Sequence, residues 1–264
     1  MKPLYIETIS LYGPGLPSWQ EAVHTLLAPE TYREDITGPL QSTFLSSGIK
    51  RKTTQHMQLA IHAADKALEG TDADLNNIEL VFASSEGDLN IAHHICYSLT
   101  LEGKPVSPTK FQNVILNAAA GHLGILLKNT ASATTVTAAA HSLAVGLLQS
   151  YTTSLTESAP ILYVAYDAPA LLKIDPHATP IDPFSVGFLL SPHPSERSIA
   201  AIRLSLQNGT EVTPIENADL SRVSARSSTA GVLPLMIALA KQQRDTVALA
   251  YSHDQVLSVE VTPC

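Results

Sequence analysis

The sequence is poor in charged side chains and in thiols. Only 15% of its 264 residues are Asp, Glu, Lys or Arg, whereas about a quarter are charged in typical globular proteins. A chain with so little charge has little surface suited to water, so we expect a partner to cover part of it. The two cysteines, Cys96 and Cys264, lie in an apolar helical pattern and at the last position. We therefore expect no disulfide framework and a reducing, cytoplasmic location.

Several classes of function are disfavoured by what the sequence does not contain. No apolar run reaches the ~18 residues of a membrane-spanning helix, and the first residues show no signal-peptide pattern. The formal net charge of -8 argues against binding nucleic acid or anionic membranes, because both attract basic surfaces. No phosphate-binding loop, dinucleotide-binding glycine motif or zinc-protease motif occurs, and no cysteine pair has metal-ligand spacing. We therefore expect no cofactor and no metal.

The sequence does contain a regular alternation of strand and helix patterns. A helix pattern without a polar face predicts a helix buried on all sides, between two sheets. Strands that are apolar on both faces are typical of interior parallel strands. We therefore expect a layered α/β domain with a largely parallel sheet, and we expect Cys96 and Leu99 to face the core. The strand patterns lie at 4–11, 78–83, 134–137, 161–165, 184–190, 199–206, 246–251 and 256–261; the helix patterns lie at 18–27, between 54 and 70, and at 89–99, 114–127, 142–148 and 228–240.

The segment from Ser107 to Leu155 carries the most informative motif. Residues 117–123 read Asn-Ala-Ala-Ala-Gly-His-Leu and are followed by a strand pattern and a turn into the apolar helix pattern. This order resembles the nucleophile-bearing core of the ketoacyl synthase family, in which an N-x-x-A-G-H-L helix precedes a short strand and the catalytic Cys lies at the next turn. Further segments are similar to that family, so the likeness covers about the first 165 residues in order. They are 9–28, 51–70, 78–88 and 161–169.

The resemblance implies the fold of the family, but the residues that carry the family's reaction are absent from this sequence. It implies thiolase-like α-β-α-β-α layers in one domain over 1–264, with a first half at 1–168 and an abbreviated second half at 169–264. The family's Cys follows the histidine of its A-G-H motif by about eighteen residues, which places Ala140 at the nucleophile position, or Ala139 with an indel of one. The family's two catalytic histidines come from loops of the second half that this chain lacks. We therefore expect no catalysis.

The remaining histidines offer no clear substitute for the missing chemistry. His177 follows its preceding strand too closely to match the family's H-G-T histidine, and His193 and His253 are interpreted as surface residues. His141 beside Ser142 is the one pair that suggests another active site. Neighbouring residues on a helix do not face each other, and no group that would orient a base is evident. Packing or helix capping is the favoured interpretation of this pair.

The chain is similar to the chain-length factors, the silent sister subunits of active ketosynthases in type II polyketide and fatty-acid-like pathways. It resembles a short member of that group, similar to the small ketosynthase-like proteins encoded in aryl polyene pigment clusters. The resemblance implies a heterodimer or larger complex with an active ketosynthase, paired through the strand that contains Thr135, and acyl carrier protein as a further partner. It also places the turn at Glu86 and the segment with Lys110 and Phe111 at the shared acyl pocket or the interface. At this turn the family has a gate residue of the acyl pocket. A carboxylate is unusual against hydrocarbon, so either Glu86 pairs with a basic residue of the partner or the gate residue lies elsewhere in this chain.

Two other functions stay open at this point. The first is a decarboxylase or acyltransferase on the same fold, although silent subunits that decarboxylate usually carry Gln where Ala140 stands. The second is a homodimeric protein that binds acyl carrier proteins or lipids, because an edge that meets a synthase could also meet its own copy.

Overall fold

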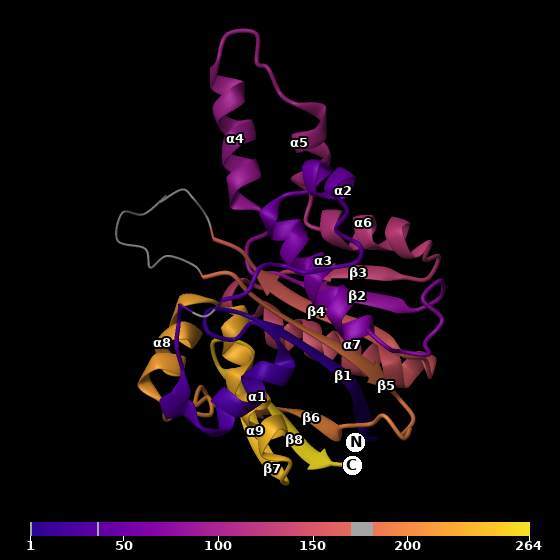
Figure 1. The fold of residues 1–264 in the computed structure, drawn as a ribbon, viewed down its shortest axis with the longest axis vertical. Coiled ribbons are helices and arrows are strands. Elements are labelled where there is room, and N and C mark those ends of the chain that lie inside the picture. The colour runs from indigo at the N-terminus through magenta and orange to yellow at the C-terminus, as the bar shows by residue number, and fades with distance from the viewer. Residues whose placement is uncertain (1, 36, 170–181) are drawn as a thin grey trace.

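The computed structural model describes residues 2–35, 37–169 and 182–264, and its strands form one continuous sheet (Figure 1). The order across the sheet is β3-β2-β4-β5-β1-β6-β8-β7. β1 joins the two halves of the chain, because it pairs with β5 on one side and with β6 on the other. The strands are β1 (Leu4–Tyr12), β2 (Glu79–Ala83), β3 (Ala133–Val136), β4 (Ile161–Asp167), β5 (Phe184–Ser191), β6 (Ala200–Asn208), β7 (Asp245–Ala250) and β8 (Gln255–Pro263).

The sheet is mixed, so the expectation of a largely parallel sheet is wrong. β2 runs parallel to β3 and β4, as the apolar patterns predicted. The other pairings among the described strands are antiparallel. The error has a physical cause. β4 and β5 are buried on both faces, and a strand without alternation carries no signal for the direction of its neighbour.

Side-chain oxygens cap the first two long helices. The backbone N–H of Glu21 donates to the Ser18 hydroxyl at 3.2 Å at the start of α1, and Thr54 caps α3. α8 was not predicted, because only two of its side chains are buried and its apolar pattern is weak. The helices are α1 (Trp19–Leu27), α2 (Ser47–Lys52), α3 (Gln55–Leu68), α4 (Leu89–Thr100), α5 (Pro108–Asn113), α6 (Ala118–Leu127), α7 (Ser142–Glu157), α8 (Ala218–Arg226) and α9 (Leu233–Lys241); the 3-10 turns are η1 (Pro29–Thr31), η2 (Ala139–His141) and η3 (Thr229–Val232).

Two apolar cores lie on opposite faces of the sheet. Alternate residues of β4 pack with α3 and α6 on one face and with α7 on the other. The second core also contains the inner faces of β6, β7 and β8 together with α9. In this core α7 packs on β1 to β5, and α9 packs on β7, β8 and α1. The layered α/β fold expected from the sequence is therefore confirmed, with both halves of the sheet joined at β1.

The central helix α7 matches the expectation of a buried helix. Within 142–148 every residue is buried or half-buried, and the exposed face begins only at Gln149. A Cβ added at Gly146 would meet the Ala83 Cβ and the Tyr163 ring, each at 2.8 Å. Glycine therefore lets α7 lie directly on β2 and β4. This close approach fixes the position of the turn that precedes α7.

The segment from Asp88 to Asn117 forms an arm that projects from the sheet, and this overturns one prediction. α4 and α5 pack on each other and extend away from the core (Figure 1). Of α4, only Ile91 and Ser98 are buried, whereas Cys96 and Leu99, which we expected to face the core, are exposed. Apolar side chains at helical spacing predict a face that needs cover. They do not say whether the cover comes from the chain's own core.

The helix predicted at 114–127 begins later than expected. Residues 114–117 form a turn, in which the N–H of Ala118 donates to the Ile115 carbonyl at 3.0 Å. The separate short helix α5 precedes this turn, opened by Ser107 and Pro108. The motif asparagine, Asn117, takes the N-cap position of α6.

Candidate functional site

The turn from β3 into α7 has the sharp geometry of a strand-to-helix nucleophile turn. Ala139 has a φ of 48°, a left-handed conformation that is unfavourable for a side chain with a Cβ. The Ser142 hydroxyl closes the turn, because it accepts from the Ala138 N–H at 2.7 Å and donates to the Ala139 carbonyl at 2.8 Å. Strained turns of this kind hold a nucleophile in front of a helix N-terminus. Here the strained residue and its neighbour Ala140 are both alanines, so the turn presents no nucleophilic side chain.

This geometry explains the role of His141 and Ser142. Ser142 is buried and both its hydrogen-bonding partners are backbone groups of the turn, so its hydroxyl stabilises the turn. α7 itself has no side-chain cap, so of the two interpretations the structure supports packing at the turn and not capping of the helix. The Nδ1 of His141 is buried without a hydrogen-bond partner, and no contact joins it to the serine hydroxyl.

A hollow of about 510 Å³ lies beside Ala140. Its walls come from η2, from the segment 212–215, from α8 and η3, and from β7. None of the described residues that line it is ionisable, so the described lining contains no side chain suited to general acid or base catalysis near neutral pH. The lining residues are Ala140, Val212, Thr213, Pro214, Ile215, Ser221, Ser224, Ala225, Ser227, Ser228, Gly231, Pro234, Ala248, Leu249 and Ala250.

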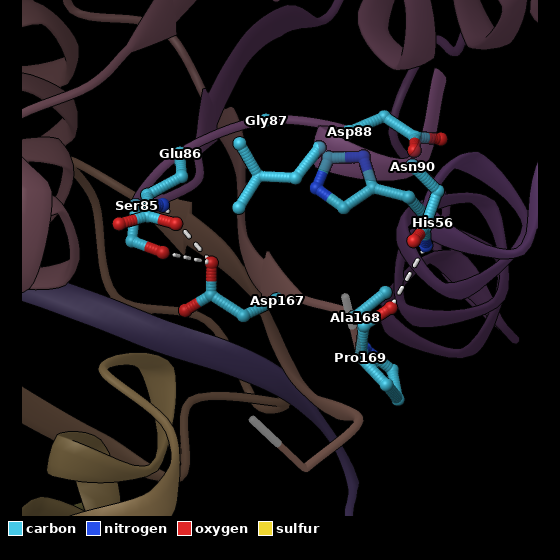
Figure 2. A pocket seen from close by; sticks show the side chains of 10 residues that line it. His56, Ser85, Glu86, Gly87, Asp88, Asn90, Asp167, Ala168 and Pro169 are labelled. Atoms are coloured by element: carbon cyan, nitrogen blue, oxygen red, sulfur yellow. Dashed lines mark hydrogen bonds between the residues drawn. The ribbon is translucent and has the colours of Figure 1, made fainter. Parts of the chain in front are cut away.

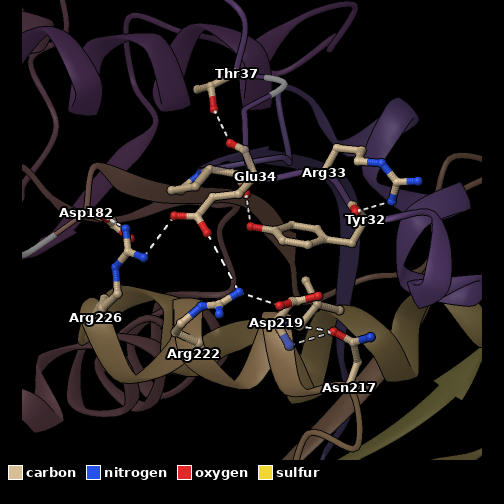
Figure 3. A network of polar contacts seen from close by, with 11 residues as sticks. Tyr32, Arg33, Glu34, Thr37, Asp182, Asn217, Asp219, Arg222 and Arg226 are labelled. Atoms are coloured by element: carbon tan, nitrogen blue, oxygen red, sulfur yellow. Dashed lines mark hydrogen bonds and ion pairs between the residues drawn. The ribbon is translucent and has the colours of Figure 1, made fainter.

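An ionic cluster holds α8, one wall of the hollow, in place (Figure 3). Arg226 donates to Glu34 at 2.9 Å and pairs with Asp182 at 2.6 Å. These hydrogen bonds, the one with Asp182 most of all, raise the pKa of the Arg226 guanidinium. The neighbouring Tyr32 donates its hydroxyl to the Pro14 carbonyl, and burial, followed by the charge of Glu34, raises its pKa to about 12. The cluster therefore links α8 to the loop that contains Glu34 and to Asp182, which lies just before β5.

Asp167, at the end of β4, accepts hydrogen bonds from the turn after β2 and from η3; Figure 2 shows those from Ser85. Its Oδ1 accepts from the N–H and the hydroxyl of Ser85 at 2.9 and 2.7 Å. Its Oδ2 accepts from the N–H and the hydroxyl of Thr229 at 3.1 and 2.7 Å. Since Ser85 belongs to the turn after β2 and Thr229 begins η3, this buried carboxylate joins the turn at Glu86 to one wall of the hollow.

His56 and Ser84 extend the network without forming a catalytic relay. The Ser84 hydroxyl lies 3.0 Å from His56 Nε2 and 3.3 Å from Asp167 Oδ1, and it accepts from the Gly87 N–H. In a catalytic triad the carboxylate holds the far nitrogen of the histidine, whereas here both groups meet the same buried hydroxyl. Burial lowers the pKa of His56, and the nearby carboxylates of Asp88 and Asp167 only partly oppose this. The network therefore holds a neutral histidine and stabilises the turn.

The structure places Glu86 at the foot of the arm. Glu86 is exposed, and its turn lines a cavity of about 10 Å³, which has room for about one water molecule. A Cβ added at Gly87 would lie 2.7 Å from Leu116, so the arm rests directly on this turn. The Thr137 hydroxyl donates to the Ser85 carbonyl at 2.9 Å. Thus the turn, the end of β3 and the base of the arm adjoin one another.

Lys110 and Phe111 lie on α5, in the arm. Lys110 Nζ lies 2.8 Å from His94 Nε2 of α4, which links the two helices of the arm. Phe111 is 62% exposed, too much for a side chain that belongs to the chain's own core. It is one member of what we call the apolar patch, a set of exposed large side chains on the arm and α6. The patch comprises Tyr97, Leu99, Leu101, Phe111, Ile115, Leu116 and Ile125.

Thr135 lies in β3, which is the edge strand of the described sheet. β3 pairs only with β2, so one side of its backbone has no strand partner among the described residues. The Thr135 hydroxyl is buried without a hydrogen-bond partner. α6, which carries Ile125, packs beside β3. Ala140, which lines the hollow, follows the end of β3 by four residues.

Sequence reasoning missed the polar network around Asp167 and the basic helix α2. Asp167 ends a fully apolar strand pattern, a position where functional carboxylates are common in α/β proteins, so a signal existed. His56 lay inside an amphipathic helix pattern and gave no signal. In α2 the residues Lys50, Arg51 and Lys52 are all exposed. His193 and His253 are exposed, as predicted; His177 lies outside the described residues.

Within the described ranges no group of His, Cys, Asp or Glu side chains is arranged to hold a metal ion. Over the same ranges, no helix is long and apolar enough to cross a membrane.

The layered α/β fold and the strand-to-helix turn define a thiolase-like protein. The family model of the β-ketoacyl synthase N-terminal domain matches residues 24–255. The chain belongs to the β-ketoacyl synthase family. A comparison with curated proteins found no match.

Solved structures agree on the fold. A chain from the complex of a ketosynthase (ApeO) with its chain length factor (ApeC) from Xenorhabdus doucetiae superposes with a TM-score of 0.76 at 18% identity, over 98% of this chain and 100% of that one. The ishigamide ketosynthase/chain length factor gives 0.74 at 14% identity, over 99% of each chain. A chain of the AntDE:AntF complex, a type II polyketide synthase acyl-carrier protein with its ketosynthase bound to the hexaketide, gives 0.77 at 11% identity, over 100% of this chain and 99% of that one.

Proposed function

We propose that this chain is a non-catalytic, chain-length-factor-like subunit that pairs with an active ketosynthase in type II polyketide or aryl polyene biosynthesis. The observation that carries the proposal is a preserved nucleophile turn that contains alanine at both candidate positions. Among the described residues, none that lines the hollow beside it is ionisable. A fold that keeps the turn and lacks its chemistry suits a subunit whose role is structural.

The partner surface follows from the edge of the sheet and the apolar patch. A free edge strand is a template for pairing with another sheet, and β3 offers such an edge beside α6. The adjacent apolar patch would be unfavourable in water. Interfaces of obligate complexes commonly bury ~2,000 Å² or more and are largely apolar. We propose that the partner ketosynthase pairs with β3 and covers the patch.

The same surface would let the subunit shape the partner's acyl pocket. Phe111 and Leu116 are exposed apolar side chains on the arm, and such side chains suit the wall of a pocket for a growing hydrocarbon chain. Glu86 stands exposed beside them without an ion pair to any described residue. We propose that Glu86 meets a basic residue of the partner and so fixes the arm over the pocket entrance.

The neighbouring structures support these partners. Two of them are described as complexes of a ketosynthase with a chain length factor, and one as a complex with an acyl-carrier protein. In this chain Lys50, Arg51 and Lys52 are exposed and make no ion pair with a described residue, although the chain is acidic overall. A local basic surface of this kind favours an acidic partner. We propose that α2 contacts the carrier protein and that the complex works in the cytoplasm.

Co-expression with the proposed partner, an active ketosynthase, tests the pairing. We expect the tagged synthase to retain the wild-type chain through purification, and Thr135→Lys to abolish this because it places a charge in the interface strand. The matched control is Thr246→Lys, which puts the same charge on β7 at the opposite edge of the sheet and should co-purify normally.

Light scattering after size exclusion separates the outcomes. A one-to-one or larger complex that contains both chains supports the proposal. A dimer of this chain alone, unaffected by added synthase, would instead support the homodimeric binding protein. A stable monomer at micromolar concentration that ignores the synthase would reject both, because the apolar patch would then need no cover.

A further inference from the structure

A second hollow, of about 350 Å³, lies at the β7 edge of the sheet, between α1, α9 and the segment that leads into α8. The strand β3, through which we propose pairing with the synthase, is at the opposite edge. Residues 213–215 and Pro234 line both hollows and so separate them, whereas Ala140 lines only the first. Sites for small organic molecules commonly have about 300–1,000 Å³ and a mostly apolar lining with a few polar groups. The second hollow has this size and this kind of lining.

Apolar side chains from three packed elements form the walls of this second hollow. α9 packs on α1 and on β7, and these elements contribute Leu26, Ile237 and Val247 to the lining. Leu27 of α1 also lines the hollow and is 52% exposed, so a large apolar side chain meets water inside a concave surface. Covering such a surface with an apolar group is favourable. The walls therefore favour a ligand with an apolar side group.

Charges of both signs line the same hollow. Lys241 ends α9, Asp245 begins β7, and Glu216 directly precedes the N-cap residue of α8. None of the three makes an ion pair with a described residue. Asp245 accepts one hydrogen bond, from the N–H of Thr246 at 2.8 Å, through one of its two oxygens. One ammonium and two carboxylate groups are therefore available to a ligand in this hollow.

The ligand that matches this lining has a cation and an anion close together on an apolar body. A ligand with one charge meets a group of its own sign in the lining, and like charges repel. A neutral ligand covers the charged groups without pairing them, which is unfavourable. A free α-amino acid carries its ammonium and carboxylate groups on one carbon. A residue inside a peptide has neither charge, so the lining favours the free amino acid over a segment of a partner protein.

We propose that this hollow binds a free α-amino acid with a large apolar side chain. Lys241 binds its carboxylate, and Glu216 and Asp245 bind its ammonium group. The apolar side chain lies against Leu27 and Ile237. The site does not depend on pairing through β3, so its test and the co-purification test can fail separately.

Titration with four matched probes, followed by NMR of the ligand signals, tests the proposal. L-Phenylalanine carries both charges, 3-phenylpropionate only the anion and 2-phenylethylamine only the cation. N-Acetyl-L-phenylalaninamide carries neither charge and represents a residue inside a peptide. The titrations use the purified full chain, in complex with the synthase where the two co-purify. Exposed ion pairs are weak, so L-phenylalanine should bind about 2- to 5-fold more tightly than either singly charged probe and more tightly still than the neutral one.

Charge substitutions assign each contact. Lys241→Gln should weaken L-phenylalanine and 3-phenylpropionate about 2- to 5-fold and leave 2-phenylethylamine unweakened. Glu216→Gln should weaken L-phenylalanine and 2-phenylethylamine by a similar factor and leave 3-phenylpropionate unweakened. The matched controls are Arg244→Gln and Glu211→Gln, which remove the same charges from exposed residues nearby that do not line the hollow; binding of all four probes should be as in the wild type.

Ile237→Trp fills the hollow from α9 and should abolish binding of all four probes. Ile237 is only half-buried, and thermal unfolding followed by circular dichroism checks that the variant is folded. Lys241 and Glu216 are exposed, so the charge test holds even if Ile237→Trp does not fold. The proposal is overturned if L-phenylalanine shows no saturable binding or if N-acetyl-L-phenylalaninamide binds as tightly. It is also overturned if Arg244→Gln weakens L-phenylalanine as much as Lys241→Gln does.

Discussion

Removing the Asp167 carboxylate should be the most destabilising polar substitution in this chain. The side chain is 4% exposed and accepts four hydrogen bonds from Ser85 and Thr229, two of them from backbone N–H groups. In Asp167→Ala the two hydroxyls can turn toward other acceptors, whereas the two N–H groups stay buried and unpaired. Each orphaned group costs about 1–3 kcal/mol, so we expect a loss of about 2–6 kcal/mol of unfolding free energy.

A loss of this size is a large part of the ~5–15 kcal/mol that typically separates folded from unfolded domains. At about 2 °C per kcal/mol for a chain of this length, the midpoint of thermal unfolding should fall by about 4–12 °C. Urea unfolding followed by circular dichroism measures the free energy directly. Amide hydrogen exchange should accelerate at the turn around Ser85 and at η3, because both lose their shared acceptor.

Two variants sharpen the test. Asp167→Asn keeps one acceptor oxygen for Ser85 but turns an NH₂ group toward the Thr229 N–H, so about half of the loss is expected. Asp65→Ala removes a buried carboxylate that accepts from only one backbone N–H, that of Thr43, and should cost about 1–3 kcal/mol without altering exchange at η3. The reasoning is wrong if Asp167→Ala lowers the unfolding free energy by less than about 1 kcal/mol, or if Asp65→Ala lowers it as much. In either case the Asp167 carboxylate does not hold the turn at Ser85 to η3.

Three further predictions concern chemistry and pH. Mass spectrometry after incubation with acyl-carrier thioester should show no covalent adduct apart from reaction at the two exposed thiols, Cys96 and Cys264; stable acylation elsewhere would contradict the non-catalytic assignment. Ala140→Cys should not restore condensation, because a thiol needs a lowered pKa and an oxyanion partner and the described lining of the hollow supplies no ionisable group; malonyl condensation by this variant would refute that account. Burial lowers the folded-state pKa of His56 and His62 below the ordinary 6.5, so unfolding free energy should be fully present above pH 6.5 and fall as the pH drops below it, since the unfolded chain then binds more protons. Replacing both by Gln should flatten this decline, whereas His253→Gln, at a side chain that is 92% exposed, should leave it unchanged.

The sequence predicted the central part of this fold well, because its signals there were local and unambiguous. An apolar helix without a polar face and an Asn-Ala-Ala-Ala-Gly-His-Leu segment each have one favourable structural interpretation. They located α7 and α6, and together they led to the turn that contains Ala140. The positive φ of Ala139 was not predictable, since alanine gives no sign of a left-handed conformation.

The arm was misjudged for a different reason. A helix that meets a partner and a helix that meets its own core need the same apolar face. Leu99 and Cys96 therefore looked like core residues, and only the packing of α4 against α5 away from the sheet shows that they are not. The join through Asp167 depends on Ser85 and Thr229, which are far apart in sequence. No pattern in one segment reveals such a contact.

The left-handed alanine before α7 has a consequence for reading genomes. A residue with a Cβ in that conformation costs about 1–2 kcal/mol relative to the right-handed form, and this chain maintains it without presenting a nucleophile there. The bend therefore forms in this chain without a nucleophilic side chain. Its backbone geometry alone does not show whether a chain carries a nucleophile. The assignment must come from the side chain at the bend and from the groups that face it.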